Sequence, residues 1–188
     1  MSAVRVAVVT VTCPGRETLL VEAEASVENQ TLPPITHLVE TNTAGPDTEG
    51  KVRNRLIARA RDEFDCNYVA ILDDDDVLDP HHLETLVGAL DTAATRPDLV
   101  YPQWRWHDGT TGSARPWDAG EIMRVNRIPV TVLLGVAIWE TCGGFKDIRH
   151  EDWELWKEIA RRGGHVLFVD EVTWTYRRSG GRGATWHG

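Results

Sequence analysis

The segment from Tyr68 to Asp76 constrains the fold more than any other part of the sequence. Its first five residues, Tyr68 to Leu72, are apolar apart from one tyrosine hydroxyl, and so short an apolar run is typical of a strand buried on both faces. Four consecutive aspartates follow directly. In an open α/β sheet the carboxyl ends of the strands border the ligand crevice. The sequence therefore predicts a core strand that ends in an acidic site.

Strand-like and helix-like segments alternate through the first half of the chain. In residues 51–64, for example, Val52, Leu56, Ala60 and Phe64 recur every four residues, which indicates one apolar helix face. A β-α-β-α-β-α order predicts an α/β fold with a parallel, right-handed, doubly wound sheet. The expected strands are residues 4–11, 35–40 and 68–72, and the expected helices are residues 17–30, 51–64 and 80–94.

The second half of the chain is less regular. At 188 residues we expect a single domain, over residues 1–177, followed by a flexible glycine-rich tail at 178–188. Pro102 lies inside a strand-like run and predicts an edge or a bulge there. The expected elements are strands at residues 98–106, 131–139, 165–169 and 172–176 and a helix at residues 151–162.

Composition excludes several classes of function. The net charge of -9 argues against nucleic acid or an anionic membrane as the main partner. The three cysteines lack zinc or CxxC spacing, and their odd number fits reduced thiols in the cytoplasm. We see no signal-peptide pattern and no apolar run of membrane-span length. A cytoplasmic protein without an integral membrane segment is therefore expected.

The aspartates themselves suggest a metal site. In an extended chain Asp73 and Asp75 share one side, and Asp74 and Asp76 share the other. Carboxylates held close together repel unless a cation lies between them, and Mg²⁺ prefers oxygen ligands from carboxylates and phosphates. The alternative is a solvated acidic turn before the next helix. We prefer that alternative only for Asp79, as the N-cap before Pro80.

Two other nucleotide-binding patterns fit less well. Residues 45–52 nearly match a P-loop, but Val52 replaces the hydroxyl that should ligate Mg²⁺, and Asp47 and Glu49 would oppose phosphate binding. A polar connecting loop is the preferred interpretation of this segment. A hydride-transfer Rossmann protein is also disfavoured, because only Gly15 follows the first strand.

Taken together, the motifs of the chain resemble those of the family 2 glycosyltransferases of GT-A fold, whose sheet is Rossmann-like and mostly parallel. The similarity runs from Val4 to Tyr176 in the family's order of motifs. It is carried by Arg53-Asn54, Leu72 to Asp76, Gly143-Gly144-Phe145, Glu151-Asp152 and Leu155-Trp156.

The resemblance implies an inverting transfer of a sugar from a nucleotide-diphosphate sugar, with Mn²⁺ or Mg²⁺ as cofactor. A UDP-sugar is the first expectation for the donor, and the acceptor is a sugar, a lipid or a protein. The processive members' Gln-x-x-Arg-Trp motif is absent, so non-processive transfer is expected. Residues 1–95 would form the nucleotide-binding half of the domain, and residues 96–177 the acceptor and catalytic half.

The resemblance also assigns roles to individual residues. Asp75 would ligate the metal, and Asp152 would be the catalytic base. Donor-binding roles would fall to Thr12 and Arg16, which line the nucleotide pocket, to Glu40 near the nucleobase, to Arg53 near the base or the diphosphate, to Asp73 at the nucleoside, and to Asp74 and Glu151.

Simpler interpretations stay open beside these roles. Glu151 and Asp152 could instead complement the positive end of a helix dipole, and Arg53 could be a solvated helix charge. Trp153 and Trp156 are expected in the core because they are three residues apart on an apolar stripe. Two further functions remain as alternatives: a P-loop nucleotide-binding enzyme and a non-catalytic module that binds nucleotide sugars. The tryptophans expected to stack on sugar rings are Trp104, Trp106 and Trp117.

Overall fold

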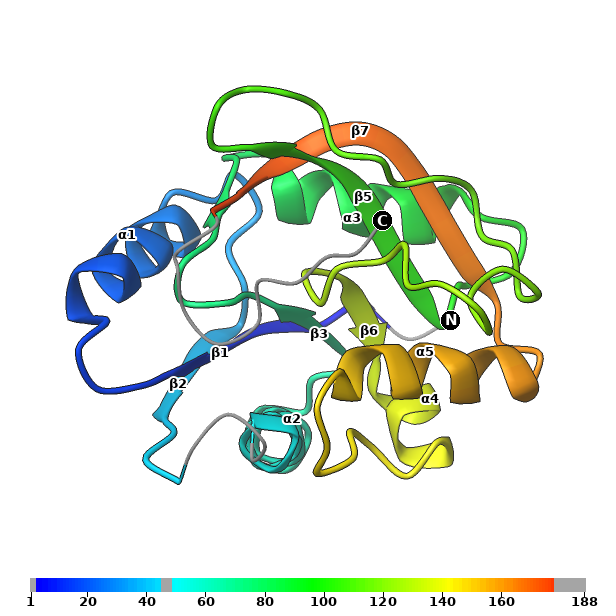
Figure 1. Cartoon of the computed structure of the whole chain (residues 1–188), viewed down its shortest axis with the longest axis horizontal. Helices are drawn as coiled ribbons and strands as arrows, with labels where there is room; N and C mark the ends of the chain where they lie inside the picture. Colours follow the sequence, from blue (N-terminus) through cyan, green and yellow to red (C-terminus); the bar gives the residue numbers. More distant parts are fainter. Residues whose placement is uncertain (1–2, 45–48, 178–188) are drawn as a thin grey trace.

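The computed structural model describes residues 3–44 and 49–177, and these residues form a seven-stranded mixed sheet between two layers of helices (Figure 1). The expected tail at 178–188 lies outside the described residues. In their order across the sheet, the strands are β2 (Thr36–Thr41), β1 (Val6–Thr12), β3 (Tyr68–Ile71), β6 (Leu133–Gly135), β5 (Leu99–Trp106), β7 (Val166–Tyr176) and β4 (Val77–Leu78).

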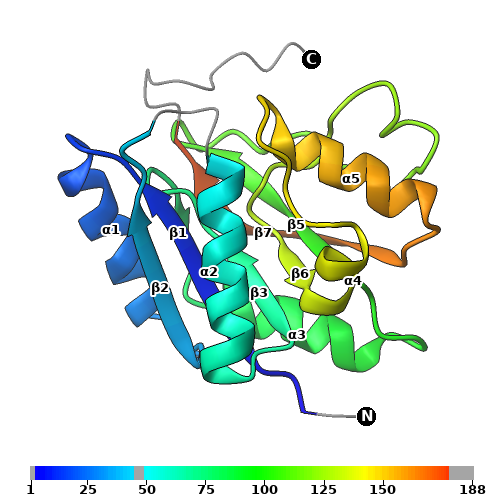
Figure 2. The same cartoon turned by 90° about the horizontal axis from the view of Figure 1, so that it is seen from below.

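Helices cover both faces of the sheet, which is the α/β arrangement predicted from the sequence (Figures 1 and 2). Every residue of β1 is buried, because β1 has a strand on either side and helices on both faces. Among the described helices, none combines the length and apolar character needed to cross a bilayer. One face carries α1 (Glu17–Glu28) and α3 (His82–Thr92), and the other carries α2 (Glu49–Phe64), α4 (Val136–Thr141) and α5 (Glu151–Arg161).

The strand directions place the candidate site. Strand β1 pairs in parallel with β2 and β3, as the β-α-β order predicts. Strand β6 then runs antiparallel between β3 and β5, and β4 runs antiparallel to β7. The carboxyl ends of β1 and β3 therefore lie side by side, so that Thr12 and the aspartates after Ile71 meet at one edge of the sheet.

The expected strand over residues 131–139 is wrong in its second half. Only Leu133–Gly135 form β6, and the chain then turns into α4 at Val136. Val136, Ile138 and Trp139 are all buried, and a short apolar run does not reveal by its periodicity whether it is a strand or a buried helix.

The two strands expected after residue 165 are one continuous strand, β7. Its pairing with β5 is interrupted where Pro102 lies opposite Val169 and Gln103 lies opposite Val172. Asp170 and Glu171 are the extra residues, and both are exposed. Of the edge or bulge predicted from Pro102, the structure has the bulge, and Asp170 and Glu171 between the two expected strands form it.

The start of α3 also differs from the prediction. Asp79 is not the N-cap, because the helix begins at His82 with His81 in the capping position. The carboxylate of Asp79 accepts hydrogen bonds from both terminal nitrogens of Arg105 on β5, one of them at 2.9 Å. The two residues before the turn, Val77 and Leu78, form the short strand β4, which the sequence did not reveal.

Candidate active site

The four aspartates after β3 form a turn and not an extended segment. The N–H of Leu72 still donates to Val9 on β1 (3.1 Å), but the N–H of Asp76 donates to the carbonyl of Asp73 (3.1 Å). Because of this turn, carboxylate oxygens of Asp73, Asp75 and Asp76 lie within 4.8 Å of one another. The predicted alternation placed Asp76 on the side of Asp74. That expectation is wrong, since alternation holds only for an extended chain.

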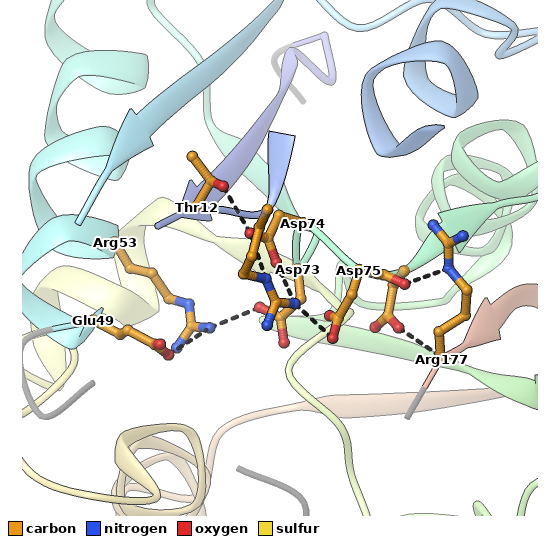
Figure 3. Close-up of polar contacts among 9 residues, drawn as sticks. Thr12, Glu49, Arg53, Asp73, Asp74, Asp75 and Arg177 are labelled. Atoms are coloured by element: carbon orange, nitrogen blue, oxygen red, sulfur yellow. Dashed lines mark hydrogen bonds and ion pairs between the residues drawn. The ribbon is translucent and has the colours of Figure 1, made fainter. Parts of the chain in front are cut away.

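Asp74 points away from this carboxylate cluster and ties the turn to the loop after β1 (Figure 3). Its carboxylate accepts hydrogen bonds from Thr12 Oγ1 (2.7 Å) and Arg16 Nε (2.9 Å). A terminal nitrogen of Arg16 also lies 2.6 Å from Asp75. The residues predicted to line the nucleotide pocket are therefore brought together, and Arg16 joins both sides of the turn.

Arg53 on α2 is the central cation of the site, and only 4% of it is exposed. Its guanidinium donates to Asp73 (2.8 Å) and lies 3.7 Å from Glu49, as Figure 3 shows. It also pairs closely with Glu151. The interpretation of Arg53 as a solvated helix charge is therefore wrong. The guanidinium of Arg53 lies over the Phe145 ring, and its ion pairs join the aspartate turn to the start of α5.

Replacing Arg53 with methionine should destabilise the fold by about 3–5 kcal/mol, because removal of one partner leaves buried carboxylates without compensation. Equilibrium unfolding in urea at pH 7 measures the loss. The matched control is Arg59→Met on the same helix, where the arginine side chain is 46% exposed and pairs only with Glu63. That change should cost less than about 1 kcal/mol. Equal losses in the two variants would contradict the role assigned to Arg53.

Asn54 has a structural role that the sequence did not reveal. Its Oδ1 accepts hydrogen bonds from Trp139 Nε1 and from the N–H of Phe145, both at 2.9 Å, and its Nδ2 donates to the carbonyl of Phe145 (2.8 Å). Gly144 has a φ of +73°, and a Cβ there would lie 2.6 Å from Asn54 Oδ1. Asn54 thus anchors the Gly-Gly-Phe segment. The only sign of this role in the sequence was that Asn54 belongs to the Arg53-Asn54 motif.

The start of α5 separates two adjacent carboxylates. Glu151 is buried against Arg53, whereas Asp152 is only partly buried. Asp152 accepts a hydrogen bond from Asn126 Nδ2 (3.2 Å). Burial, and next to it the charge of Glu151, raise the pKa of Asp152 to about 6. A carboxylate with a pKa near neutrality is suited to accept a proton. The two carboxylates also differ in their partners, since Glu151 pairs with Arg53 and Asp152 accepts from Asn126.

Arg177, directly after β7, is a further member of the site. Its N–H donates to Asp76 Oδ1 (2.9 Å), and its Nε donates to the carbonyl of Asp75 (2.5 Å), as Figure 3 shows. Burial and the charges of Asp73 and Asp75 raise the pKa of Asp76 well above its usual value. Arg177 therefore supports the aspartate turn through both its backbone and its guanidinium.

The remaining predicted residues are more scattered. Glu40 on β2 pairs with Arg55 (Nε to Oε1, 3.0 Å). Within the described residues, this ion pair does not connect Glu40 to the aspartate turn. Trp104 is only 1% exposed and belongs to the core, so its predicted role in sugar stacking is wrong. Trp117 is partly buried and lines a pocket together with Tyr101 and Arg127. The core positions expected for Trp153 and Trp156 are confirmed.

The P-loop interpretation finds no support in the described part of its segment, residues 49–52. A Cβ at Gly50 would lie 2.4 Å from the carbonyl of Lys146, so close packing against the segment before α5 requires a small residue there. Lys51 forms an ion pair with Asp147, and Val52 is buried in the core. Residues 45–48 lie outside the described residues.

The carboxylate cluster fits a divalent cation. It offers hard oxygen donors from Asp73, Asp75 and Asp76, which is the ligand type that Mg²⁺ and Mn²⁺ prefer. Burial together with the charge of Asp75 raises the pKa of Asp73, in opposition to Arg53. Both Asp73 and Asp76 are thus held in surroundings where a further positive charge would be favourable.

Comparison with known proteins identifies the class. Residues 42–156 match the model of glycosyl transferase family 2, which covers more than half of the chain, and the chain belongs to this family. No curated protein matches its sequence.

The fold is the GT-A fold, as solved structures show. S. aureus TarS 1–349 in complex with UDP-GlcNAc matches with a TM-score of 0.74 at 13% identity, over 97% of this chain and 61% of that chain. The same protein in complex with UDP matches with a TM-score of 0.71 at 15% identity, over 94% of this chain and 61% of that chain. This chain thus spans about three fifths of the length of those TarS chains.

Proposed function

We propose that the protein transfers a sugar from a nucleotide-diphosphate sugar to an acceptor hydroxyl, with inversion at the anomeric carbon and with help from a divalent cation. One observation carries the proposal. In a family 2 chain, Arg53 joins a cluster of three aspartates to a helix start that presents Asp152 as a partly buried carboxylate of raised pKa.

The aspartate turn forms the donor side of the proposed site. Asp75 and Asp76, with Asp73 beside them, would hold Mn²⁺ or Mg²⁺, which stabilises negative charge on the departing diphosphate. UDP is our first choice of nucleotide, because S. aureus TarS structures with UDP and UDP-GlcNAc share this fold. We assign contacts with the donor to Thr12, Arg16, Glu40, Arg53, Asp73, Asp74 and Glu151.

Asp152 is the proposed base. The acceptor hydroxyl must lose a proton as its oxygen attacks the anomeric carbon, and a positioned carboxylate that takes this proton contributes about 10²–10⁴-fold to the rate. Glu151 is less suited, because its carboxylate already forms a close ion pair with the buried guanidinium of Arg53. In addition to its assigned contact with the donor, Glu151 holds Arg53 against the donor side.

The rate should depend on pH through Asp152. The pKa of this group is raised to about 6, so the carboxyl keeps its proton up to that pH and can accept one only above it. The value of kcat/KM should therefore be constant above pH 7 and fall tenfold per pH unit below about 6. Initial rates between pH 5 and 8 at saturating Mn²⁺ measure the profile.

Glu49 provides the control for this profile, because burial raises its pKa to about 7. A Glu49→Gln variant removes that titration and leaves Asp152 in place. The fall of kcat/KM at low pH, the acidic limb of the profile, should still begin near pH 6 in the variant. If the fall of kcat/KM at low pH disappears in this variant, the titrating group is Glu49 and not Asp152. That result would contradict the role of Asp152.

Trp117 is the proposed acceptor platform. It lines a pocket with Arg115, Glu121 and Arg127, and the same segment carries the asparagine that contacts Asp152. A Trp117→Ala change should raise the KM for the acceptor about 3- to 10-fold, because an aromatic face that stacks on a ring is lost. The KM for the donor should not change. Steady-state kinetics with each substrate varied in turn decide this, and an effect on the donor alone would refute it.

The direct test is a thermal-shift screen of UDP-, GDP-, CDP- and dTDP-sugars with and without Mn²⁺. We expect one nucleotide class to stabilise the protein, and to do so only with the metal. Stabilisation by ATP or GTP, with turnover of those nucleotides, would instead support the P-loop alternative. We further propose that residues 1–177 act as one domain and that the reaction takes place in the cytoplasm.

A further inference from the structure

Asn126 is the residue whose side-chain amide donates a hydrogen bond to Asp152. The loop that carries it is held against α5 by two indole hydrogen bonds, from Trp153 Nε1 to the carbonyl of Ile122 (2.6 Å) and from Trp156 Nε1 to the carbonyl of Ile128 (3.3 Å). The backbone position of Asn126 beside the start of α5 is therefore set by core side chains.

The orientation of the Asn126 amide is also determined. Its Oδ1 accepts a hydrogen bond from the N–H of Ile128 (3.0 Å), so its Nδ2 is the atom that faces Asp152 Oδ2 at 3.2 Å. The flipped amide would place two donors together at Ile128 and an oxygen against a carboxylate at Asp152. The surrounding hydrogen bonds thus allow one orientation, and in it Asn126 donates to the carboxylate.

This donation has two consequences for Asp152. It engages Oδ2, so that Oδ1 is the carboxylate oxygen that Asn126 does not contact. It also favours the charged form of the carboxylate, since a hydrogen bond to a carboxylate stabilises the charge. Of the other groups around Asp152, Glu151 on the same helix and Asp73 after β3 oppose the charge. The backbone N–H of Trp153 and the guanidinium of Arg53 on α2 support it.

We propose that Asn126 is a positioning residue for the catalytic base: its amide selects which oxygen of Asp152 takes the proton and holds that carboxylate in the charged form. The proposal rests on the function proposed above, because it assumes that Asp152 is the base. A purely structural role would require only the acceptor oxygen that receives the N–H of Ile128, whereas a donor is needed only by Asp152.

Asn126→Asp separates these two roles. Aspartate has the same shape and keeps an oxygen for Ile128, but it cannot donate while charged, and it places a second carboxylate next to Asp152. We expect kcat to fall at least tenfold and the acidic limb of the pH profile to move up by about one pH unit, because a hydrogen bond to a charged group contributes about 1.5–3 kcal/mol. The KM for the donor should stay as in the wild type.

Asn126→Ala and Met123→Ala complete the set. The alanine at position 126 removes the hydrogen-bond donor without adding charge. The acidic limb of its pH profile should therefore also move to higher pH, but by less than in Asn126→Asp. Met123 is 40% exposed on the same loop, and its replacement should leave both kcat and the limb unchanged. A wild-type profile in Asn126→Asp, or a loss confined to the KM for the donor, would overturn the proposal.

A readout without turnover keeps this test separate from that of the proposed function. Titration of the Asp152 carboxyl carbon by ¹³C NMR reports its pKa directly in the wild type and in the Asn126 variants. An upward shift in both variants is expected. If the wild type transfers no sugar to any acceptor, the proposed function fails. If the carboxyl titrates identically in wild type and variants, the positioning role fails, whatever the activity.

Discussion

Replacing Asp152 with asparagine is expected to lower kcat by about 10²–10⁴-fold, because the amide cannot take the proton of the acceptor hydroxyl. Binding of the donor with Mn²⁺ should change little, because the carboxylate cluster lies in the turn after β3, whereas Asp152 lies at the start of α5. The variant should also fold, because asparagine has the same shape as aspartate and the position is only partly buried. Rates at saturating donor, together with donor binding by calorimetry, measure the two effects separately.

Glu154→Gln on the same helix is the matched control for this experiment. It also removes one negative charge from the first turn of α5, but Glu154 pairs with Lys157 and Lys146. We expect its kcat to stay within about twofold of the wild type, as for other surface ion pairs. If Asp152→Asn left every measurable function intact, the protein would be a binding module of this fold and not a transferase.

Replacing Asp75 with alanine is expected to abolish the metal dependence of donor binding. The carboxylates of Asp73 and Asp76 would remain, but two carboxylates hold a divalent cation less tightly than three. The thermal shift caused by donor plus Mn²⁺ should fall to the shift caused by donor alone. Asp76→Asn should also lower the metal-dependent thermal shift. The sequence alone did not predict a role in metal binding for Asp76.

Asp91→Asn serves as the control for the loss of one acidic charge. Asp91 lies on α3, its side chain is 62% exposed, and its ion pair with Arg96 is long (3.7 Å). The metal-dependent shift should be unchanged in this variant. An Asp75→Ala protein that kept the full shift would remove Asp75 from the metal site and, with it, the arrangement of the donor side proposed here.

Much of the fold could be predicted because local patterns carry it. The four-residue spacing of Val52, Leu56 and Ala60 indicated α2, and all three are buried. The apolar run at Tyr68 indicated a strand covered on both faces, which β3 is. The same patterns failed where periodicity is uninformative, as in the short apolar run that became β6 and α4.

The sequence by itself determined the class of the protein and the position of the carboxylates of its candidate site. A buried strand that ends in four aspartates has its carboxylates at an edge of the sheet, and the order of the later motifs indicated glycosyl transferase family 2.

Only the tertiary structure decided which side chains act together. The turn at Asp73 brings Asp76 into the cluster, and Arg177 reaches the same turn from a strand 101 residues further along the chain. Asn54 and Asn126 find their partners 91 and 26 residues away. Such contacts depend on how helices and loops pack on the sheet, and that packing is set by many side chains at once, so no local pattern in the sequence records it.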